Sequence, residues 1–207
     1  QVVYISKKCL EVHNQPLTNI VFMGMGEPLL NYKNVLRSIH FITSEEGLNM
    51  SYKRITLSTS GISKMIRKLA DDNVKVNLAL SLHAANEELR KKIMPIGKSN
   101  TLEEIRDSLK YYFSKTKKKV TYEYVLLRDV NDSIEDAYQL YKYTKHLSSK
   151  VNIIEYNAVE GLEFKKSSFE KTEKFIGYLL KKGVNVSLRR SRGKDINAAC
   201  GQLANKN

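Results

Sequence analysis

The chain has 207 residues, 42% apolar and 28% charged, which is enough to build one large domain around a hydrophobic core. No apolar run reaches the roughly 18 residues of a membrane span, and two cysteines, Cys9 and Cys200, are too few for a secreted disulfide scaffold, so we expect a cytoplasmic protein without membrane contact. The net charge of +13 favours a polyanionic partner such as RNA or DNA, with a general lysine bias as the alternative.

The apolar pattern predicts helices and strands that alternate along the chain. In order, we expect a helix at 1–14, a strand at 19–25, a helix from 31, a strand at 54–60, a helix at 62–72 and a strand at 76–83. A short helix at 86–93, a helix from 101, a strand at 119–127, a helix at 132–147, a strand at 151–157, a helix from 167 and a strand at 184–188 follow. A short helix or loop at 195–203 ends the chain. This alternation indicates a parallel sheet in a single domain over 1–207.

Two helix starts carry the Ser/Thr-x-x-Glu pattern of a capping box, at 101–104 and at 167–170. For the helix that follows the second of them, the spacing predicts a buried face formed by Phe169, Phe175, Ile176, Leu179 and Leu180. Cys9, in the first helix, is interpreted as a buried packing residue, as most free cysteines are.

Two predicted strands have one apolar and one polar face. In the strand at 54–60, Thr56, Ser58 and Ser60 share a face, and in the strand at 76–83 Ser81 and His83 do. A doubly wound sheet is apolar on both faces, whereas the inside of a barrel can line a polar cavity. The predicted fold class is therefore α/β, a partial (βα) barrel, although hydrogen-bonded core hydroxyls would explain any one of these residues.

The strand at 19–25 ends in Gly24-Met-Gly-Glu-Pro28. Its glycines would let a ligand lie against the backbone, and Glu27 stands at the carboxyl-terminal tip of a strand, where α/β proteins bind ligands. The alternative is a turn with a surface glutamate.

No metal-ligand spacing relates the four histidines, and the sequence contains no phosphate-binding glycine motif. Near the end of the chain, crowded cations would attract RNA phosphates and favour a thiolate at Cys200. These candidate RNA-binding residues are Arg189, Arg190, Arg192 and Lys194. A buried, unreactive cysteine is the alternative for Cys200.

Taken together, these motifs resemble the RlmN/Cfr family of radical SAM RNA methyltransferases, RlmN more closely than Cfr, over essentially the whole chain. The sequences that carry the resemblance are Gly24-Met-Gly-Glu-Pro28, Thr56-Leu-Ser-Thr-Ser60-Gly61, Ser81-Leu-His83, Met94-Pro-Ile96, Val130-Asn-Asp132, Asn157 and Asp195-Ile-Asn-Ala-Ala-Cys200-Gly-Gln-Leu203.

The resemblance implies a dual-specificity enzyme that methylates adenine carbon 2 in 23S rRNA and tRNA, using S-adenosylmethionine (SAM) and a [4Fe–4S] cluster. It implies that Gly26 and Glu27 hold the amino group of SAM, and that five further residues line the ligand: Ser58, Ser81, Leu82, His83 and Asn157. Cys200 would be the catalytic residue, methylated by one SAM and then activated by a 5′-deoxyadenosyl radical from a second. An electron donor such as flavodoxin and a monomeric state complete this expectation.

The chain departs from the family's pattern, and the family's resolving cysteine and proposed proton acceptor have no match in it. The family's Cys-x3-Cys-x2-Cys cluster motif is missing, so we expect no metal ligands within this chain. We accordingly expect a fragment without the first barrel strand, inactive alone, whose segment 184–207 carries the methyl-carrier cysteine. Three alternatives stay open: Cfr-like methylation at carbon 8, a non-catalytic RNA-binding remnant, and a barrel enzyme for another phosphorylated ligand.

Overall fold

The computed structural model describes residues 2–24, 26–158 and 161–189. One sheet of six parallel strands runs through it in the order β1 to β6. The strands are β1 (Ile20–Phe22), β2 (Ile55–Thr59), β3 (Asn77–Ser81), β4 (Val120–Leu126), β5 (Ser149–Glu155) and β6 (Val186–Arg189). The α-helices are α1 (Val2–His13), α2 (Tyr32–Thr43), α3 (Ser63–Asp71), α4 (Glu87–Ile93), α5 (Leu102–Thr116), α6 (Ile134–Thr144) and α7 (Phe169–Lys181). Every strand and helix predicted within the described residues is present.

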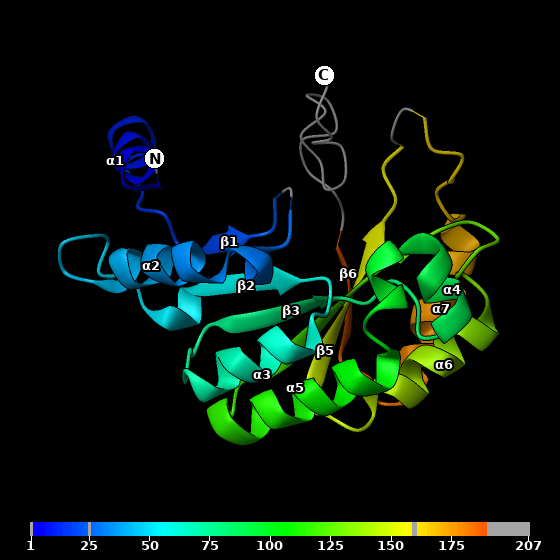
Figure 1. Ribbon diagram of the computed structural model, residues 1–207. Helices are drawn as coiled ribbons and strands as arrows, with labels where there is room; N and C mark the ends of the chain where they lie inside the picture. The colour runs from blue at the N-terminus through cyan, green and yellow to red at the C-terminus, as the bar shows by residue number, and fades with distance from the viewer. Residues whose placement is uncertain (1, 25, 159–160, 190–207) are drawn as a thin grey trace.

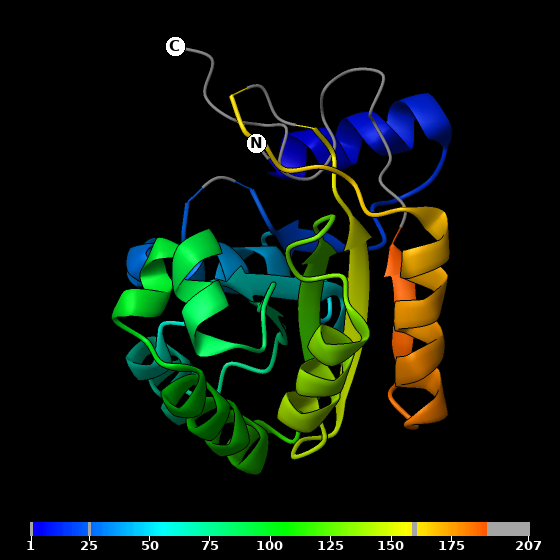
Figure 2. The ribbon, with the colours of Figure 1, turned by 90° about the vertical axis from the view of Figure 1, so that its right-hand side faces the viewer.

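The sheet is open and strongly curved. Each strand pairs in parallel with the next one along the chain, and α3, α5, α6 and α7 lie along its outer side (Figures 1 and 2). The curvature brings the two edge strands toward each other. Arg189 Nη1, at the end of β6, lies only 3.9 Å from Met23 Sδ, just after β1. The predicted parallel α/β fold is confirmed, with the strands wrapped around a polar interior.

The hydrophobic core lies between the outer face of the sheet and these helices. In β3, Leu78 and Leu80 alternate with Asn77 and Ser81, so the apolar side chains point outward to the helices. The helices supply the other half of the core with fully buried residues such as Phe175 of α7. This one-sided core leaves the inner face of the sheet available for polar groups.

The capping box predicted at 101–104 is confirmed, since Thr101 and Glu104 exchange their side-chain and backbone hydrogen bonds. The one predicted at 167–170 is wrong by one residue. Ser168 is the cap of α7 and accepts from the Lys171 N–H at 3.2 Å, whereas the buried Ser167 donates to Asp132 Oδ2 at 2.7 Å. The buried aspartate therefore takes the side chain that the sequence pattern assigned to the helix cap.

The predicted buried face of α7 is partly wrong as well. Phe175 and Leu179 are fully buried, but Phe169 is 75% exposed and Leu180 57% exposed. The helical spacing assigns Phe169 to the apolar side of α7. It stands in the first turn of the helix, however, where no described residue covers its side chain.

The prediction that Cys9 is buried is wrong. Helix α1 has no buried residue, and Cys9 is partly exposed. In Figure 1 this helix stands apart from the helices that cover the sheet. None of the described helices combines the length and apolarity that crossing a membrane requires.

Candidate functional site

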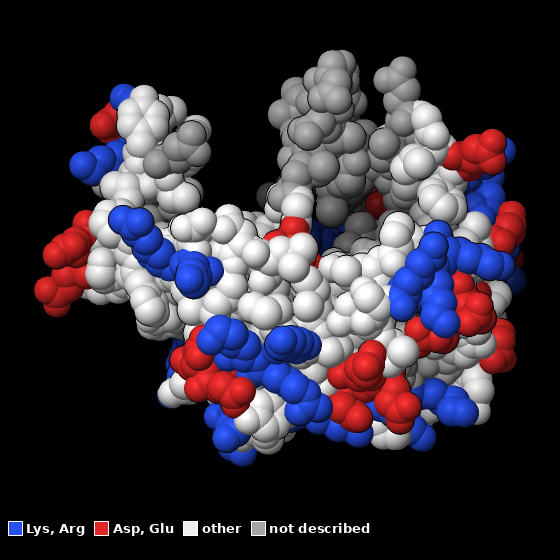
Figure 3. Space-filling view, in the orientation of Figure 1, with Lys and Arg blue, Asp and Glu red and all other residues white. Residues whose placement is uncertain are grey.

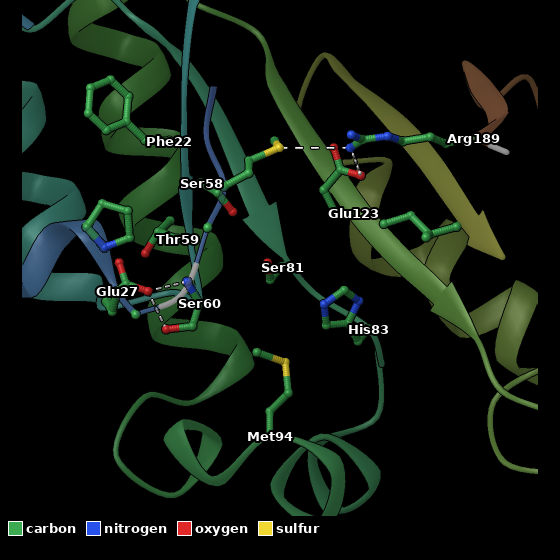
Figure 4. A pocket seen from close by; sticks show the side chains of 15 residues that line it. Phe22, Glu27, Ser58, Thr59, Ser60, Ser81, His83, Met94, Glu123 and Arg189 are labelled. Carbon is green, nitrogen blue, oxygen red and sulfur yellow. Dashed lines mark hydrogen bonds and ion pairs between the residues drawn. The ribbon is translucent and has the colours of Figure 1, made fainter. Parts of the chain in front are cut away.

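A cavity of about 300 Å³ opens at the carboxyl-terminal edge of the strands, on the inner face of the sheet. Figure 4 shows side chains from both ends of the chain converging on it. Its lining residues are Phe22, Met23, Gly24, Gly26, Glu27, Pro28, Ser58, Thr59, Ser60, Ser81, His83, Met94, Glu123, Ile154 and Arg189.

Glu27 ties the end of β1 to the end of β2. Its Oε2 accepts hydrogen bonds from the backbone N–H and the Oγ–H of Ser60, both at 2.6 Å. Its Oε1 accepts the Leu29 N–H at 3.1 Å, which caps the short 3₁₀ turn Pro28–Asn31. Because an ionised carboxylate offers about four acceptor positions, Glu27 keeps capacity for one donor from a ligand.

The backbone of Ser60, in the loop that follows β2, is fixed by a further contact. The guanidinium of Arg90, which is fully buried in α4, donates from Nη2 to the Ser60 carbonyl at 2.6 Å. Gly61 adopts φ +100°, and a Cβ there would lie 2.8 Å from Ile105 Cδ1. Arg90 is thus a supporting residue that sequence reasoning missed, because a helical pattern assigns an arginine to the solvent side.

A row of polar residues crosses the inner face of four strands. The strand register places Ser81, Glu123, Asn152 and Ser187 opposite one another on β3 to β6. Asn152 Nδ2 donates to Glu123 Oε1 at 2.9 Å, and Ser187 Oγ donates to Asn152 Oδ1 at 2.9 Å. Sequence reasoning missed Glu123, although a carboxylate between two buried tyrosines was a signal that could have pointed to it.

Glu123 is 4% exposed, and burial raises the pKa of its carboxyl group. Its Oε2 has no hydrogen-bond partner among the described residues and lies 4.0 Å from Arg189 Nη1. The cavity wall therefore carries two carboxyl groups, those of Glu27 and Glu123, and one guanidinium, that of Arg189.

His83 enters the cavity from the loop after β3. It adopts φ +56°, and its Nδ1 accepts the Val125 N–H at 3.2 Å. Burial, with a smaller effect of the Arg90 charge, lowers the pKa of His83 to about 4. The imidazole is therefore neutral near pH 7, with its proton on Nε2, which can donate to a ligand.

The titration of His83 predicts how stability depends on pH. The unfolded chain takes up a proton at this residue near pH 6.5, but the folded chain does so only near pH 4, so the free energy of unfolding should fall as the pH drops through this window. Urea unfolding at several pH values should show this fall in the wild type and less of it in His83→Gln. Parallel pH curves for the two proteins would contradict the prediction.

A second, more apolar cavity of about 370 Å³ adjoins the first and shares His83, Met94 and Ile154 with it. Its other lining residues are Ile93, Val125, Leu127, Glu155, Tyr156, Asn157, Leu162 and Phe164. The two neighbouring cavities together offer one polar and one apolar compartment.

The structure brings most of the candidate ligand residues together. Gly26, Glu27, Ser58 and Ser81 line the first cavity, His83 lines both, and Asn157 lines the second. The side chain of Leu82 is buried in the core and lines neither cavity. Its backbone N–H donates to the Glu123 carbonyl, and its own carbonyl accepts the Ala84 N–H.

Of the candidate RNA-binding residues, Arg189 lines the first cavity, while Arg190, Arg192 and Lys194 lie outside the described residues. Cys200 lies outside them as well. Elsewhere the charge is mixed. Figure 3 shows Lys and Arg interleaved with Asp and Glu on the face in view, so the excess of positive charge forms no unbroken patch there.

The described residues contain no group of three or more His, Cys, Asp or Glu that could hold a metal ion. Cys9 is their single cysteine. They do not fit a [4Fe–4S] cluster, which needs several thiolate ligands.

Comparison with known proteins adds to this geometry. The family model of the radical SAM superfamily matches residues 2–141. The probable dual-specificity RNA methyltransferase RlmN of Flavobacterium psychrophilum is 55% identical over 206 residues, which are 100% of this chain and 59% of that protein. The crystal structure of a radical SAM methyltransferase from Sphaerobacter thermophilus has 39% identity and a TM-score of 0.94, covering 97% of this chain and 59% of that one.

A more distant structure, native anSMEcpe with bound AdoMet, has 17% identity and a TM-score of 0.54 over 91% of this chain and 54% of that one, and shares the fold alone. This chain therefore spans 59% of the length of the RlmN relative and of the methyltransferase structure.

Proposed function

Because the chain belongs to the radical SAM superfamily, we propose that its cavity binds SAM and that the whole protein methylates carbon 2 of adenine in 23S rRNA and tRNA. The names of the relatives support an RNA methyltransferase of the RlmN type. The choice of carbon 2, the tRNA substrate and the methylated cysteine are what the resemblance to the RlmN/Cfr family implies. An electron donor such as flavodoxin, a monomeric state and a cytoplasmic location belong to the same proposal.

The described residues fit SAM. A Cβ added at Gly24 or Gly26 would meet no atom within 4 Å, so the backbone at this edge of the cavity is open to a ligand. Glu27 can accept a hydrogen bond from the ammonium group, while Ser58 and Ser81 offer hydroxyl groups in the same cavity. The single observation that carries the proposal is this convergence of an open glycine edge and a fixed carboxylate. SAM bound there would supply the methyl group. The radical chemistry of the family would also need an electron from a [4Fe–4S] cluster, which the described residues do not fit.

Cys200 is the proposed methyl carrier. It follows β6 by eleven positions in the sequence, and β6 ends at the cavity with Arg189. The cations Arg190, Arg192 and Lys194 precede Cys200 and would attract the phosphates of an RNA substrate.

The proposal is tested in a bacterial host that lacks adenine carbon 2 methylation of its 23S rRNA and tRNA. Expression of the whole protein should restore 2-methyladenosine in digested rRNA and tRNA, as measured by mass spectrometry. Cys200→Ala should abolish it. The matched control, Cys9→Ala in the exposed helix α1, should keep it. Appearance of 8-methyladenosine would favour the Cfr-like alternative, and no modified adenine from a folded protein would overturn the proposal.

A further inference from the structure

The buried carboxylate of Glu123 has a fixed orientation. Asn152 holds its Oε1, and Ser187 in turn holds the amide oxygen of Asn152, so the amide group cannot rotate without losing both bonds. The remaining oxygen, Oε2, is buried in the wall of the first cavity without a hydrogen-bond partner among the described residues. A buried carboxylate oxygen without a hydrogen-bond partner destabilises the fold unless a ligand interacts with it.

The nearest cation does not complete it. Arg189 Nη1 lies 4.0 Å from Oε2, which is beyond hydrogen-bond distance, and the Arg189 side chain is 47% exposed. The guanidinium reaches across to Met23 Sδ at 3.9 Å instead. In Figure 4, Glu123 and Arg189 stand on the opposite side of the cavity from Glu27.

The charges around the cavity match those of SAM. Its wall carries two carboxyl groups, Glu27 and Glu123, and one guanidinium, Arg189. Burial raises the pKa of Glu123, and a cationic ligand beside it would favour the ionised form. SAM carries two cationic centres, an ammonium and a sulfonium, and one carboxylate. Glu27 is committed by its Ser60 and Leu29 bonds to one end of the cavity, which leaves Glu123 as the second anion.

We propose that Glu123 is the counter-charge of the SAM sulfonium, a ligand-binding role distinct from that of Glu27 at the ammonium. The assignment rests on the proposed function, because it takes SAM as the ligand of this cavity. A carboxylate opposite the sulfonium makes the site selective for the charged cofactor over S-adenosylhomocysteine, which lacks the charge but keeps the ammonium, the carboxylate and the ribose.

The test measures the affinities of the full chain for SAM and for S-adenosylhomocysteine by calorimetry. Glu123→Gln keeps the shape and an oxygen for Asn152 but removes the charge. It should weaken SAM binding by about tenfold or more and leave S-adenosylhomocysteine binding within about twofold, because the lost charge faces the sulfonium, which S-adenosylhomocysteine lacks, and lies farther from the ammonium that the two ligands share. Glu27→Gln should weaken both ligands together.

Arg189→Gln is a second test of the same proposal, in which the buried Glu123 itself is unchanged. Removing this cation from beside Glu123 should raise the preference for SAM over S-adenosylhomocysteine, since the wall facing the sulfonium becomes more negative. The exposed Glu173→Gln is the matched charge control and should change neither affinity.

The outcomes separate the two proposals. If the wild type binds neither ligand, the proposed SAM site is wrong and this assignment falls with it. If the wild type binds SAM but Glu123→Gln and Arg189→Gln leave the preference unchanged, the SAM site stands and the role of Glu123 is overturned. Equal weakening of both ligands in Glu123→Gln would likewise overturn the sulfonium assignment.

Discussion

Replacing Glu27 by Gln is expected to lower the affinity of the chain for SAM by roughly 10- to 100-fold. The carboxylate would hold the ammonium through a charge-assisted hydrogen bond, which the neutral amide cannot form. The amide also turns one acceptor oxygen into an NH₂ donor. That donor would face either the Ser60 or the Leu29 N–H, which now donate to the carboxylate.

The same exchange should lower the stability of the folded chain by about 1–3 kcal/mol, because at least one of these N–H groups loses its acceptor. Calorimetric titration with SAM and urea unfolding measure the two effects separately. Glu173→Gln, on the exposed side of α7, should change neither quantity. Unchanged SAM affinity in a folded Glu27→Gln protein would contradict the proposal that Glu27 binds the ammonium group of SAM.

The fold was predictable because each element is specified locally. Alternating apolar and polar residues in β2 and β3 identify strands with two different faces, and that difference distinguished a barrel-like sheet from a doubly wound one. The resemblance to RlmN predicted from the motifs is confirmed by the identity over the full chain. The misplaced helix cap arose because a distant residue, Asp132, competes for Ser167. The errors at Cys9 and Phe169 arose because no part of the described chain buries these side chains.

The site was only partly predictable. Glu27 follows a strand and precedes a proline, so its place at the sheet edge could be read from its neighbours in the sequence. Glu123 and Arg90 could not be identified in this way, because their roles depend on strand register and on the packing of α4 against the Ser60 loop. Such contacts join residues 29 or 30 positions apart.

Two phenylalanines of α7 separate the contribution of burial from that of residue type. Phe175 is fully buried and its ring lies 5.5 Å from that of Tyr124 on β4. Phe175→Ala should therefore lower the free energy of unfolding by about 3–5 kcal/mol, through lost apolar contact and the cavity left behind. Such a loss is a large part of the roughly 5–15 kcal/mol that holds a domain folded.

Phe169→Ala is the matched variant in the same helix. Its side chain is 75% exposed, and alanine has the higher helix propensity, so the free energy of unfolding should change by less than about 0.5 kcal/mol. Urea unfolding of both variants, followed by circular dichroism, measures the difference. Similar losses in the two variants would mean that Phe169 is covered in solution, as the apolar spacing of the sequence predicted. The hydrophobic core at α7 would then include the first turn of the helix.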